Sequence, residues 1–404
     1  MRILMLAQFY PPDIGGEERH VRNLSIELVS RGHEVAVATF CLEGQPELEI
    51  DQGVRVYRIH TSMQRASFLF SNKARPHAPP FPDPEALWSL RRVILHECPD
   101  IIHAHNWIVH SFLPLKAWSK AKLVVTLHDY SLLCATKRLM YKDTVCSGPK
   151  LQKCLKCTIK HYGAVKGVLT TLTNAISARA ERNVVDMFLP VSQAVAEGTQ
   201  LTKHGVRHRM IPNFVPNDLS MTCDHTSPLL TQLPQENYLL FVGDIMRDKG
   251  VEVLLRAYAE LESLVPLVLI GRSAANFSMD LPPNVIRLQS WPHSAVMSAW
   301  SRCMVALVPS IWPDPCPTVA MEAMTFGKPI VASRIGGLSD IINDGETGFL
   351  VAPGNAHALC EGIRCLLDDP VRREYMSGMA KQRVVEFQAR AVVPRIEQVY
   401  QEVM

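Results

Sequence analysis

The chain has 404 residues, of which 47% are hydrophobic and 20% are charged. The length predicts about two to three domains, and the composition is that of a globular protein. No stretch approaches the roughly 18 apolar residues of a transmembrane helix, and the apolar start Ile3–Ala7 is too short for a signal peptide. We therefore expect a cytoplasmic protein, whose eleven cysteines we do not expect to be paired in disulfides.

The charge is unevenly distributed along the chain. Residues 1–215 hold 27 Lys and Arg against 18 Asp and Glu, whereas the remainder holds 15 against 21. A basic first half favours an anionic acceptor or a membrane surface, with the protein lying peripherally on the inner face of the membrane. A chance imbalance on solvated faces would give the same counts.

The first predicted elements are a buried strand over Ile3–Ala7 and a helix from Glu17 to about Arg31, joined by a loop that contains Gly15 and Gly16. Missing side chains let the backbone approach a ligand, and a helix start adds free N–H donors. A simple turn is the alternative interpretation of the glycine pair. Further strands are predicted at Val35–Phe40 and Val54–Ile59.

Residues 61–84 contain five prolines within nine positions, a density that no regular element tolerates. We predict a surface loop near an acceptor opening, or a passive connector. A helix is then predicted over Ala86–His96.

Two later strands of the first half end in polar side chains. Asp100–His105 places His103 and His105 on one face, and Val124–Tyr130 ends in His128, Asp129 and Tyr130. The carboxyl ends of parallel strands are where α/β folds bind ligands, so these residues are candidates for a binding site. Histidines with a purely structural role are the alternative.

Four cysteines, Cys134, Cys146, Cys154 and Cys157, follow with the spacing C-x11-C-x7-C-x2-C. Four thiolates could bind one structural Zn²⁺ tetrahedrally; free thiols and disulfides are the alternatives. Eight Lys and Arg residues surround them against one acid, Asp143, which favours an anionic acceptor. A helix over Val168–Asp186 follows, in which Leu169, Leu172 and Ile176 are spaced for burial.

Residues 215–235 are rich in Pro, Asn, Asp, Thr and Ser and are predicted to be a linker. A strand is predicted over Tyr238–Val242, and the turn after it contains Gly243, Arg247 and Lys249. The Lys249 ammonium is a point charge suited to a diphosphate, and Arg272, just after the next strand, is available to the same phosphates.

The stretch Val305–Ser333 reads VALVPSIWPDPCPTVAMEAMTFGKPIVAS and predicts strand, loop, helix and strand, with the helix at Thr318–Phe326. The helix start near Pro317, Thr318 and Val319 favours a phosphate, because free N–H groups and the positive dipole end meet there. Glu322 can accept hydrogen bonds from a ribose diol, and Asp314 lies where a donor sugar would be. An ordinary loop with two solvated acids is the alternative.

The acids Asp314 and Glu322, followed by Gly327-Lys328-Pro329 and Gly336-Gly337, resemble the E-x7-E signature of family 4 glycosyltransferases. Gly32-His33-Glu34-Val35, the strand ending in His128-Asp129-Tyr130 and Ile211-Pro212-Asn213 resemble other motifs of that family. The chain departs from the family pattern at Asp314, where the family has Glu, and at Asp244, where it has Arg. We hypothesise that Arg247 supplies the missing cation.

The resemblance implies an α/β protein of the GT-B fold, with two Rossmann-like domains facing each other across a cleft. The domains expected are an acceptor-binding domain 1–214 with a cysteine insertion 134–157, a linker 215–235, a nucleotide-sugar domain 236–385 and a helix 386–404 that crosses back to the first domain. The four-cysteine insertion places the chain in one branch of the family.

The expected activity is retaining transfer of a hexosyl group from a nucleoside diphosphate sugar, a UDP- or GDP-sugar, to a lipid-linked or anionic glycan in polysaccharide or glycoconjugate synthesis. His128, Asp314, Glu322 and Lys249 are the expected catalytic residues. The residues expected on the donor are Gly15, Gly16, Gly243, Arg247, Lys249, Arg272, Pro317, Thr318, Val319 and Glu322, and those on the acceptor side are His105, Asp129 and Tyr130. No cofactor for catalysis and no nucleic acid partner are expected. A GT-B protein that binds sugar nucleotides without turnover and a nucleotide-sugar epimerase are the alternatives.

Overall fold

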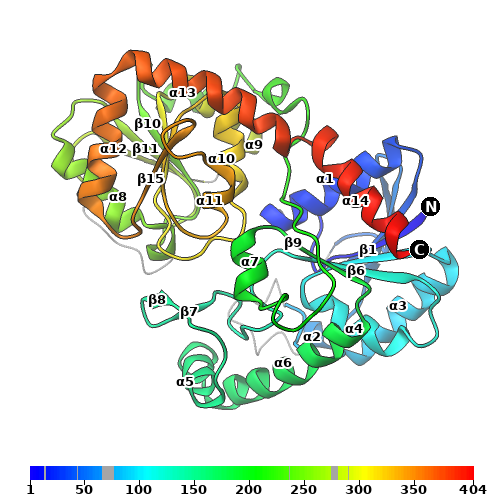
Figure 1. The fold of residues 1–404 in the computed structure, drawn as a ribbon. Helices are drawn as coiled ribbons and strands as arrows, with labels where there is room; N and C mark the ends of the chain where they lie inside the picture. The colour runs from blue at the N-terminus through cyan, green and yellow to red at the C-terminus, as the bar shows by residue number, and fades with distance from the viewer. Residues whose placement is uncertain (13–14, 43, 66–76, 236, 274–280, 290) are drawn as a thin grey trace. The chain divides into compact units, whose positions relative to one another are not determined.

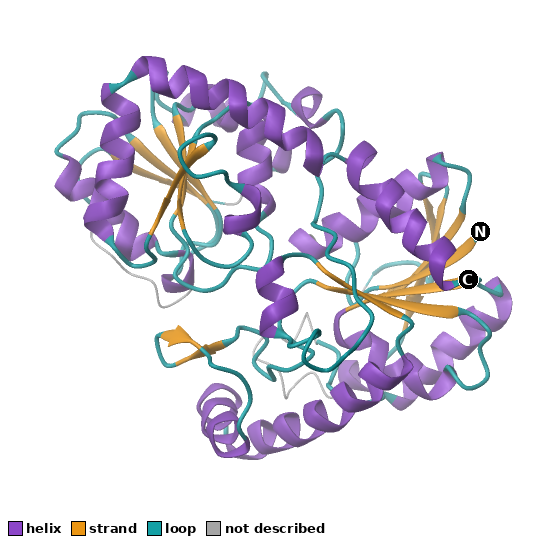
Figure 2. Cartoon of the chain, in the orientation of Figure 1, coloured by secondary structure: helices purple, strands orange, loops and turns teal. Residues whose placement is uncertain are grey.

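The computed structural model describes residues 1–12, 15–42, 44–65, 77–235, 237–273, 281–289 and 291–404 (Figure 1). The chain divides into two compact units. The first unit comprises Met1–Pro212 and Val392–Met404, and the second comprises Asn213–Ala391. Each unit is an α/β domain, with helices beside a mostly or wholly parallel sheet (Figure 2).

The first unit is built on a seven-stranded sheet with the order β3-β4-β2-β1-β5-β6-β9. Every pairing is parallel except that of the edge strand β3 with β4. Its strands are β1 Arg2–Leu6, β2 Glu34–Phe40, β3 Leu48–Asp51, β4 Val54–Ile59, β5 Ile101–His105, β6 Lys122–Leu127 and β9 Met187–Pro190, with a separate hairpin of β7 Met140–Tyr141 and β8 Thr144–Val145. Its helices are α1 Gly16–Ser30, α2 Ser62–Arg65, α3 Pro84–Glu97, α4 Val109–Phe112, α5 Leu151–Tyr162, α6 Ala164–Val184, α7 Gln193–Gly198 and most of α14 Ala389–Val403, with 3-10 helices η2 Asn106–Ile108 and η3 Leu113–Leu115.

The second unit is built on a six-stranded parallel sheet with the order β12-β11-β10-β13-β14-β15. Its strands are β10 Leu239–Val242, β11 Leu267–Ile270, β12 Val285–Leu288, β13 Val305–Val308, β14 Ile330–Ser333 and β15 Gly348–Val351. Its helices are α8 Val251–Leu261, α9 His293–Arg302, α10 Thr318–Thr325, α11 Leu338–Ile341, α12 Ala356–Asp368 and α13 Pro370–Arg383, with 3-10 helices η4 Leu219–Thr222, η5 Pro228–Gln232, η6 Arg247–Lys249 and η7 Val384–Phe387.

The central strands are short apolar runs because both faces of a parallel sheet are covered by helices. All four residues of β13 and of β14 are buried, and the two strands pair in register with Ala306 opposite Ile330. The strands and helices predicted from apolar runs and helical spacing are confirmed to within about two residues at most ends. The strand predicted over Val124–Tyr130 is wrong at its end, because β6 stops at Leu127 and leaves His128 on the turn that follows.

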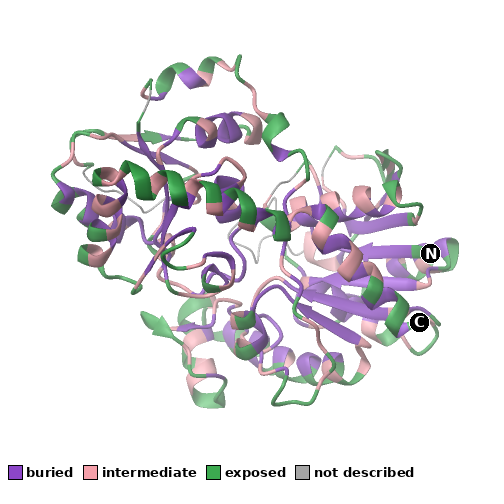
Figure 3. Cartoon of the chain, turned by 45° about the horizontal axis from the view of Figure 1, so that its top comes forward, coloured by how far each residue is buried: buried purple, intermediate pink, exposed green. Residues whose placement is uncertain are grey.

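The prediction of residues 61–84 as an irregular loop is wrong at both ends, where α2 and the start of α3 lie, and residues 66–76 lie outside the described residues. The predicted burial of α6 is also wrong. Leu169, Leu172 and Ile176 are 51%, 46% and 71% exposed, because the opposite face of the helix is the one that packs (Figure 3).

The segment 215–235, predicted as a linker, belongs to the second unit and contains η4 and η5. The last helix, α14, returns to the first unit from Val392 onward. Of the helices in the described part of the chain, none has both the length and the apolarity that crossing a membrane requires.

Candidate functional site

In the second unit, close backbone contacts bring two turns together at the carboxyl ends of β10 and β13. Gly250 adopts a left-handed conformation with φ 75°, and a Cβ there would overlap the carbonyl of Pro309. The amide of Ile311 donates to the carbonyl of Asp248 over 2.9 Å. Only glycine fits this approach at position 250, so the turn that carries Lys249 lies directly against the loop that carries Asp314.

Lys249 and Asp314 form an ion pair in which Nζ of the lysine contacts Oδ2 of the aspartate. The side chains are 28% and 9% exposed, and the lysine Nζ also lies 5.6 Å from the centre of the Trp312 ring. Two residues predicted independently for the donor site are thus brought together, 65 positions apart in sequence. The pair is an ammonium group held at a sheet edge by a carboxylate that an anionic ligand could displace.

A pair of glycines fixes the loop around Asp314 from the other side. The amide of Gly337 donates to the carbonyl of Asp314 over 2.8 Å. A Cβ on Gly336, whose φ is 58°, would overlap the backbone of Asp314, and one on Gly337 would overlap Pro315. These glycines therefore let the segment before α11 lie against the acidic loop and hold it in place.

Helix α10 begins directly after this loop and offers an uncapped N-terminus. Pro317 is its N-cap, no side chain caps the first turn, and that turn contains no acidic residue. The backbone N–H groups near Thr318 and Val319 therefore lack the helical partners of later residues, and the positive end of the helix dipole adds to them. This is a suitable place for a phosphate.

Glu322 lies one turn into α10 and is only 4% exposed. Its Oε1 lies 3.1 Å from Nε2 of His293, the first residue of α9. His293 is the more exposed partner, and the contact ties the carboxylate to the start of α9. This contact was not predicted, because His293 has no motif around it and reaches Glu322 only through the topology of the sheet.

The two arginines predicted for the donor differ in their surroundings. Arg272 Nε lies 3.1 Å from Oδ1 of Asp244 in an exposed pair, so the residue that replaces the family arginine is itself neutralised. The backbones beneath them are close, because a Cβ on Gly271 would overlap the carbonyl of Gly243. Arg247 lies in η6 on the same turn as Lys249.

In the first unit, the carboxyl ends of β5 and β6 carry a cluster of four imidazole rings. Nδ1 of His105 lies 2.9 Å from Nε2 of His128, and the rings are stacked with centres 5.2 Å apart. His103 lies against His105 with ring centres 4.5 Å apart, and His20 from α1 lies 5.0 Å from His128. His103 is fixed in turn by Thr126 and by the hydroxyl of Tyr400 in α14, each at 2.7 Å.

Burial keeps three of the four imidazoles, those of His20, His103 and His105, uncharged at neutral pH. Burial lowers the pKa of His20 to about 4 and that of His103 to about 3. The pKa of His105 lies well below its usual value because of burial and of the neighbouring imidazoles. His105 is fully buried, so it can act on a ligand only through the more exposed His128, its hydrogen-bond partner.

The other two residues predicted for the acceptor side, Asp129 and Tyr130, make contacts within the first unit. Asp129 accepts a hydrogen bond from the amide of Ser131 over 2.7 Å and so closes the turn after β6. Tyr130 is fully buried, and a Cβ on Gly198 would overlap its ring. Because the end of α7 packs against this ring, Tyr130 borders the strand end with a buried side chain, and its place on the acceptor side stays a prediction.

At the glycine pair before α1, the backbone leaves space for a ligand, but the acidic residues that follow disfavour an anion. A Cβ on Gly16 would meet no atom of the described residues within 4 Å, so this part of the chain leaves room for a ligand beside the backbone. Gly15 is the extended N-cap of α1, but the first turn carries Glu17 and Glu18. These carboxylates oppose a second anion, so α10 offers the better phosphate site of the two helix starts.

The four cysteines lie around the hairpin and α5. Burial raises the pKa of the Cys154 and Cys157 thiols, and the nearby Cys134 and Cys146 raise both further, which shows that the four lie in one region. All four thiols are free. Within the ranges that the structure describes, however, no three His, Cys, Asp or Glu side chains are grouped so as to hold a metal ion. The metal stays a prediction.

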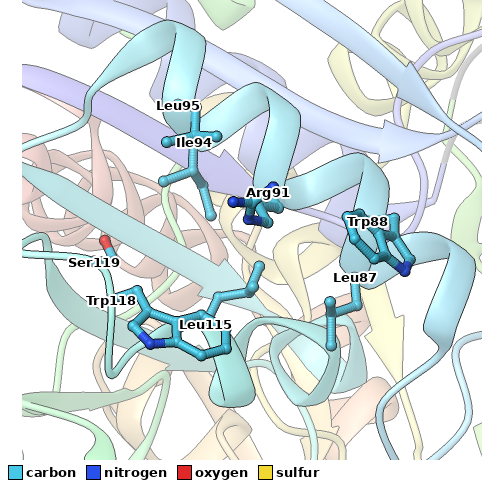
Figure 4. Close-up of a pocket in the computed structure, with 8 residues that line it drawn as sticks. All are labelled: Leu87, Trp88, Arg91, Ile94, Leu95, Leu115, Trp118 and Ser119. Carbon is cyan, nitrogen blue, oxygen red and sulfur yellow. The ribbon is translucent and has the colours of Figure 1, made fainter.

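One hollow on the first unit lies away from these strand ends. It has a volume of about 570 Å³ and is lined by apolar side chains of α3, by Arg91 and by the segment from Leu115 to Ser119 (Figure 4). Because that segment immediately precedes β6, it lies at the amino end of the strand rather than at the carboxyl edge. The hollow therefore does not belong to the candidate site.

The comparisons with known proteins agree with this arrangement. Two Rossmann-like units, each with polar residues at its strand ends, are the GT-B fold of nucleotide-dependent glycosyltransferases. Residues 14–219 match the family model described as Glycosyltransferase Family 4, and residues 230–383 match Glycosyl transferases group 1. The chain belongs to glycosyltransferase family 4 and is a glycosyltransferase.

Individual relatives cover nearly the whole chain. A glycogen synthase of Mycobacterium tuberculosis is 28% identical over an alignment of 429 positions, gaps included, that covers 99% of this chain and 94% of that protein. The sucrose-phosphate synthase of Thermosynechococcus elongatus has a similar structure, with a TM-score of 0.75 and 21% identity over 99% of this chain and 98% of that one. The Anabaena protein HepE in complex with UDP-glucose has a TM-score of 0.69 at 18% identity, with 99% of each chain covered.

Proposed function

We propose that this glycosyltransferase moves a hexosyl group from a nucleoside diphosphate sugar to an acceptor hydroxyl, with retention at the anomeric carbon. The observation that carries the proposal is the ion pair of Lys249 and Asp314 beside the uncapped start of α10, with Glu322 one turn further. An ammonium group, free backbone N–H groups and a buried carboxylate are the partners that a diphosphate and a ribose require.

In the proposed reaction the departing diphosphate receives most of the assistance. Lys249 and the backbone N–H groups near Thr318 and Val319 stabilise the charge that develops on the leaving phosphate. Glu322, held by His293, accepts hydrogen bonds from the ribose hydroxyls. Asp314 is released from Lys249 when the diphosphate arrives and then binds a hydroxyl of the donor sugar.

The proposed role of the first unit is to bind the sugar and the acceptor. His128 contacts the transferred sugar, and His105 holds the His128 ring through their hydrogen bond. Gly16 leaves open space for a ligand beside the backbone at the start of α1. These assignments follow the family motifs that the residues match.

For the donor we propose a UDP- or GDP-sugar, an assignment supported by the UDP-glucose bound to the similar structure of HepE. For the acceptor we propose a lipid-linked or anionic glycan of polysaccharide or glycoconjugate synthesis, with the enzyme in peripheral contact with a membrane. The excess of Lys and Arg in residues 1–215 supports both assignments.

We propose a structural Zn²⁺ for Cys134, Cys146, Cys154 and Cys157. Its support is the electrostatic proximity of the four thiols and the C-x2-C half-site on α5. Metal analysis of the purified protein tests it, and equal zinc content in wild type and in Cys154→Ser/Cys157→Ser would rule this site out.

A second candidate is a protein that binds sugar nucleotides without turnover. The observation that favours it is that Lys249 and Arg272 are both paired with carboxylates, and that Asp244 and Asp314 replace family residues. Release of nucleoside diphosphate only in the presence of an acceptor separates the enzyme from this alternative.

The decisive experiment is a thermal-shift screen against UDP-, GDP-, ADP- and dTDP-sugars. A ligand at 100 times its Kd adds about 2.7 kcal/mol of stability, which is a shift of several degrees. Lys249→Met should abolish the shift, whereas Lys381→Met, at an exposed lysine of α13 in the same unit, should keep it. If the melting temperature of the wild type does not change with any of the four nucleotide sugars, the proposed donor site is contradicted.

A further inference from the structure

The hollow between α3 and residues 115–119 is large enough for a small ligand. Its volume of about 570 Å³ lies within the range of about 300–1,000 Å³ that is usual for ligand sites. The hollow lies at the amino end of β6, whereas His128 follows the carboxyl end of that strand. The six residues of β6 separate the two positions by about 20 Å at about 3.3 Å each, so the hollow is a separate site from the histidine cluster.

Two indole rings stand in water at this hollow. Trp88 of α3 is 61% exposed, and Trp118 is 80% exposed. Figure 4 shows them at opposite ends of the hollow, with Arg91 between them. An indole is one of the largest apolar surfaces that a side chain can bury, so two exposed rings at one hollow indicate a surface that binds a ligand.

The packing of α3 fixes the outward position of Trp88. Ala86 and Leu90, on the opposite face of the helix, are fully buried, and Val93 on the same face is 6% exposed. Rotating the helix to bury the indole would bring these apolar side chains into water. Trp88 and Arg91 therefore stay on the side of the hollow.

Hydrogen bonds within its own turn fix the position of Trp118. The amides of Trp118 and Ser119 both donate to the carbonyl of Leu115 over 3.0 Å. Nζ of Lys116 donates to the carbonyl of Ala121 over 2.6 Å and so closes the same turn. The indole is carried by an ordered turn, and a ligand that binds it loses little affinity to the ordering of the chain.

The electrostatic character of the hollow comes from Arg91. Among the described residues that line the hollow, it is the one charged side chain, and none is acidic. Its guanidinium carbon lies 5.8 Å from the centre of the Trp88 ring, a cation–π contact that orients the side chain. Arg91 forms no ion pair with the described part of the chain. The hollow thus combines a positive charge with aromatic faces, and this charge favours an anionic occupant.

We propose that the hollow binds acidic sugar residues of a glycan chain, with sugar rings against the two indoles and a carboxylate on Arg91. The electron-rich face of an indole attracts polarised C–H groups, and a pyranose ring carries such groups on its faces. A guanidinium binds a carboxylate through two parallel hydrogen bonds. An acidic sugar supplies both partners from one chemical unit.

Other occupants fit the hollow less well. A lipid chain or an apolar helix would take water from Arg91 without replacing its hydrogen bonds, and this loss costs free energy. A nucleotide has one flat base, whereas the indoles of Trp88 and Trp118 lie at opposite ends of the hollow (Figure 4). A glycan repeats its rings along the chain, so it can contact both indoles at once.

The choice of a sugar ligand rests on the proposed function, in which the acceptor is an anionic glycan. A glycan held at the hollow stays near the enzyme between transfers, and a second point of attachment raises the affinity for long acceptors without a new contact at the reacting group. Binding at the hollow requires no donor and no turnover. The hollow and the donor site can therefore fail separately.

The test measures binding in the absence of a donor, by tryptophan fluorescence and isothermal titration calorimetry. The probes are tetrasaccharides of galacturonate, glucuronate and mannuronate, with maltotetraose as the neutral match. We expect an acidic tetrasaccharide to bind more tightly than maltotetraose and to shift the emission to shorter wavelength. Trp88→Ala and Trp118→Ala should each weaken binding by about fivefold to tenfold. Arg91→Met should remove the preference for the acidic over the neutral probe.

Tyr375→Ala and Arg256→Met, at exposed side chains of the second unit, are the matched controls and should bind as the wild type does. The Trp88→Ala/Trp118→Ala variant should keep its melting temperature and its thermal shift with the nucleotide sugar, because both indoles are exposed. Absence of binding of all three acidic probes at millimolar concentration, or unchanged binding by the double variant, would overturn the proposal. So would binding of UDP or of phosphatidylglycerol vesicles that the double variant loses, because the hollow would then take a nucleotide or a lipid surface.

Discussion

Lys249 and Asp314 allow a quantitative test of the donor site through a double-mutant cycle. Asp314 is 9% exposed and its carboxylate is paired with the ammonium of Lys249, which is 28% exposed. Removing one partner of a fully buried pair costs about 3–5 kcal/mol. Because water can reach the lysine end of this pair, we expect Lys249→Met to lower the free energy of unfolding by about 2 kcal/mol.

Asp314→Asn should cost less, about 1 kcal/mol, because the lysine that it leaves can turn toward solvent. The double variant should then lose less than the sum of the two, with a coupling energy of at least about 1 kcal/mol. Calorimetry and urea unfolding followed by tryptophan fluorescence measure these differences. Additive losses, within about 0.5 kcal/mol, would show that the ion pair contributes nothing and would refute this reasoning.

Binding of the free nucleoside diphosphate should respond in opposite directions in the two single variants. Asp314 competes with the diphosphate for Lys249, so Asp314→Asn should strengthen nucleoside diphosphate binding by about fivefold, the equivalent of the coupling of about 1 kcal/mol. Lys249→Met should weaken binding. If isothermal titration calorimetry finds that Asp314→Asn also weakens it, the carboxylate is not displaced when the diphosphate binds.

Three further predictions concern both units. Burial lowers the pKa of His20 to about 4 and that of His103 to about 3 in the folded chain, whereas both have a pKa of about 6.5 when the chain is unfolded. As the pH falls below about 6.5, the unfolded chain therefore takes up these protons before the folded chain does. The stability that the neutral histidines contribute is present above that pH and is lost as the pH falls toward the folded-state values. Each histidine should cost about 2 kcal/mol between pH 7 and pH 5, measured as a falling melting temperature of the first unit; an unchanged melt would contradict their burial. His293→Ala should weaken nucleotide-sugar binding about tenfold by releasing Glu322, and equal affinity by calorimetry would show that the contact does not matter. Arg247→Ala should lower turnover by at least about 100-fold if it acts on the leaving phosphate, whereas a loss below about threefold would make it a solvated residue.

The sequence predicted the scaffold well because local patterns determine it. The apolar runs of β10 and β13 can only be buried strands of a covered parallel sheet, and they are found where predicted. The edge strand β3 was missed, because its residues Leu48 and Ile50 are exposed and give no burial pattern. The spacing of apolar residues in α6 predicted a helix correctly but could not indicate which face packs, and here the polar face does.

The candidate site was predicted in part for a similar reason. Lys249, Asp314 and Glu322 have motifs around them, and the structure places the first two in contact. The partners that hold them do not have motifs. His293, and the chain of contacts from Tyr400 through His103 to His105, depend on distant segments that meet only in the folded chain.

The path of the chain through α14 has a consequence for biosynthesis. The first unit is complete only when Val392–Met404 returns to it, and Tyr400 of that segment is fully buried against His103. A ribosome adds about 5–20 residues per second, so Pro212 is made about 10 to 40 s before Met404. During that interval the nascent first unit lacks part of its core, so its final packing must follow the synthesis of the second unit, although its sequence begins first.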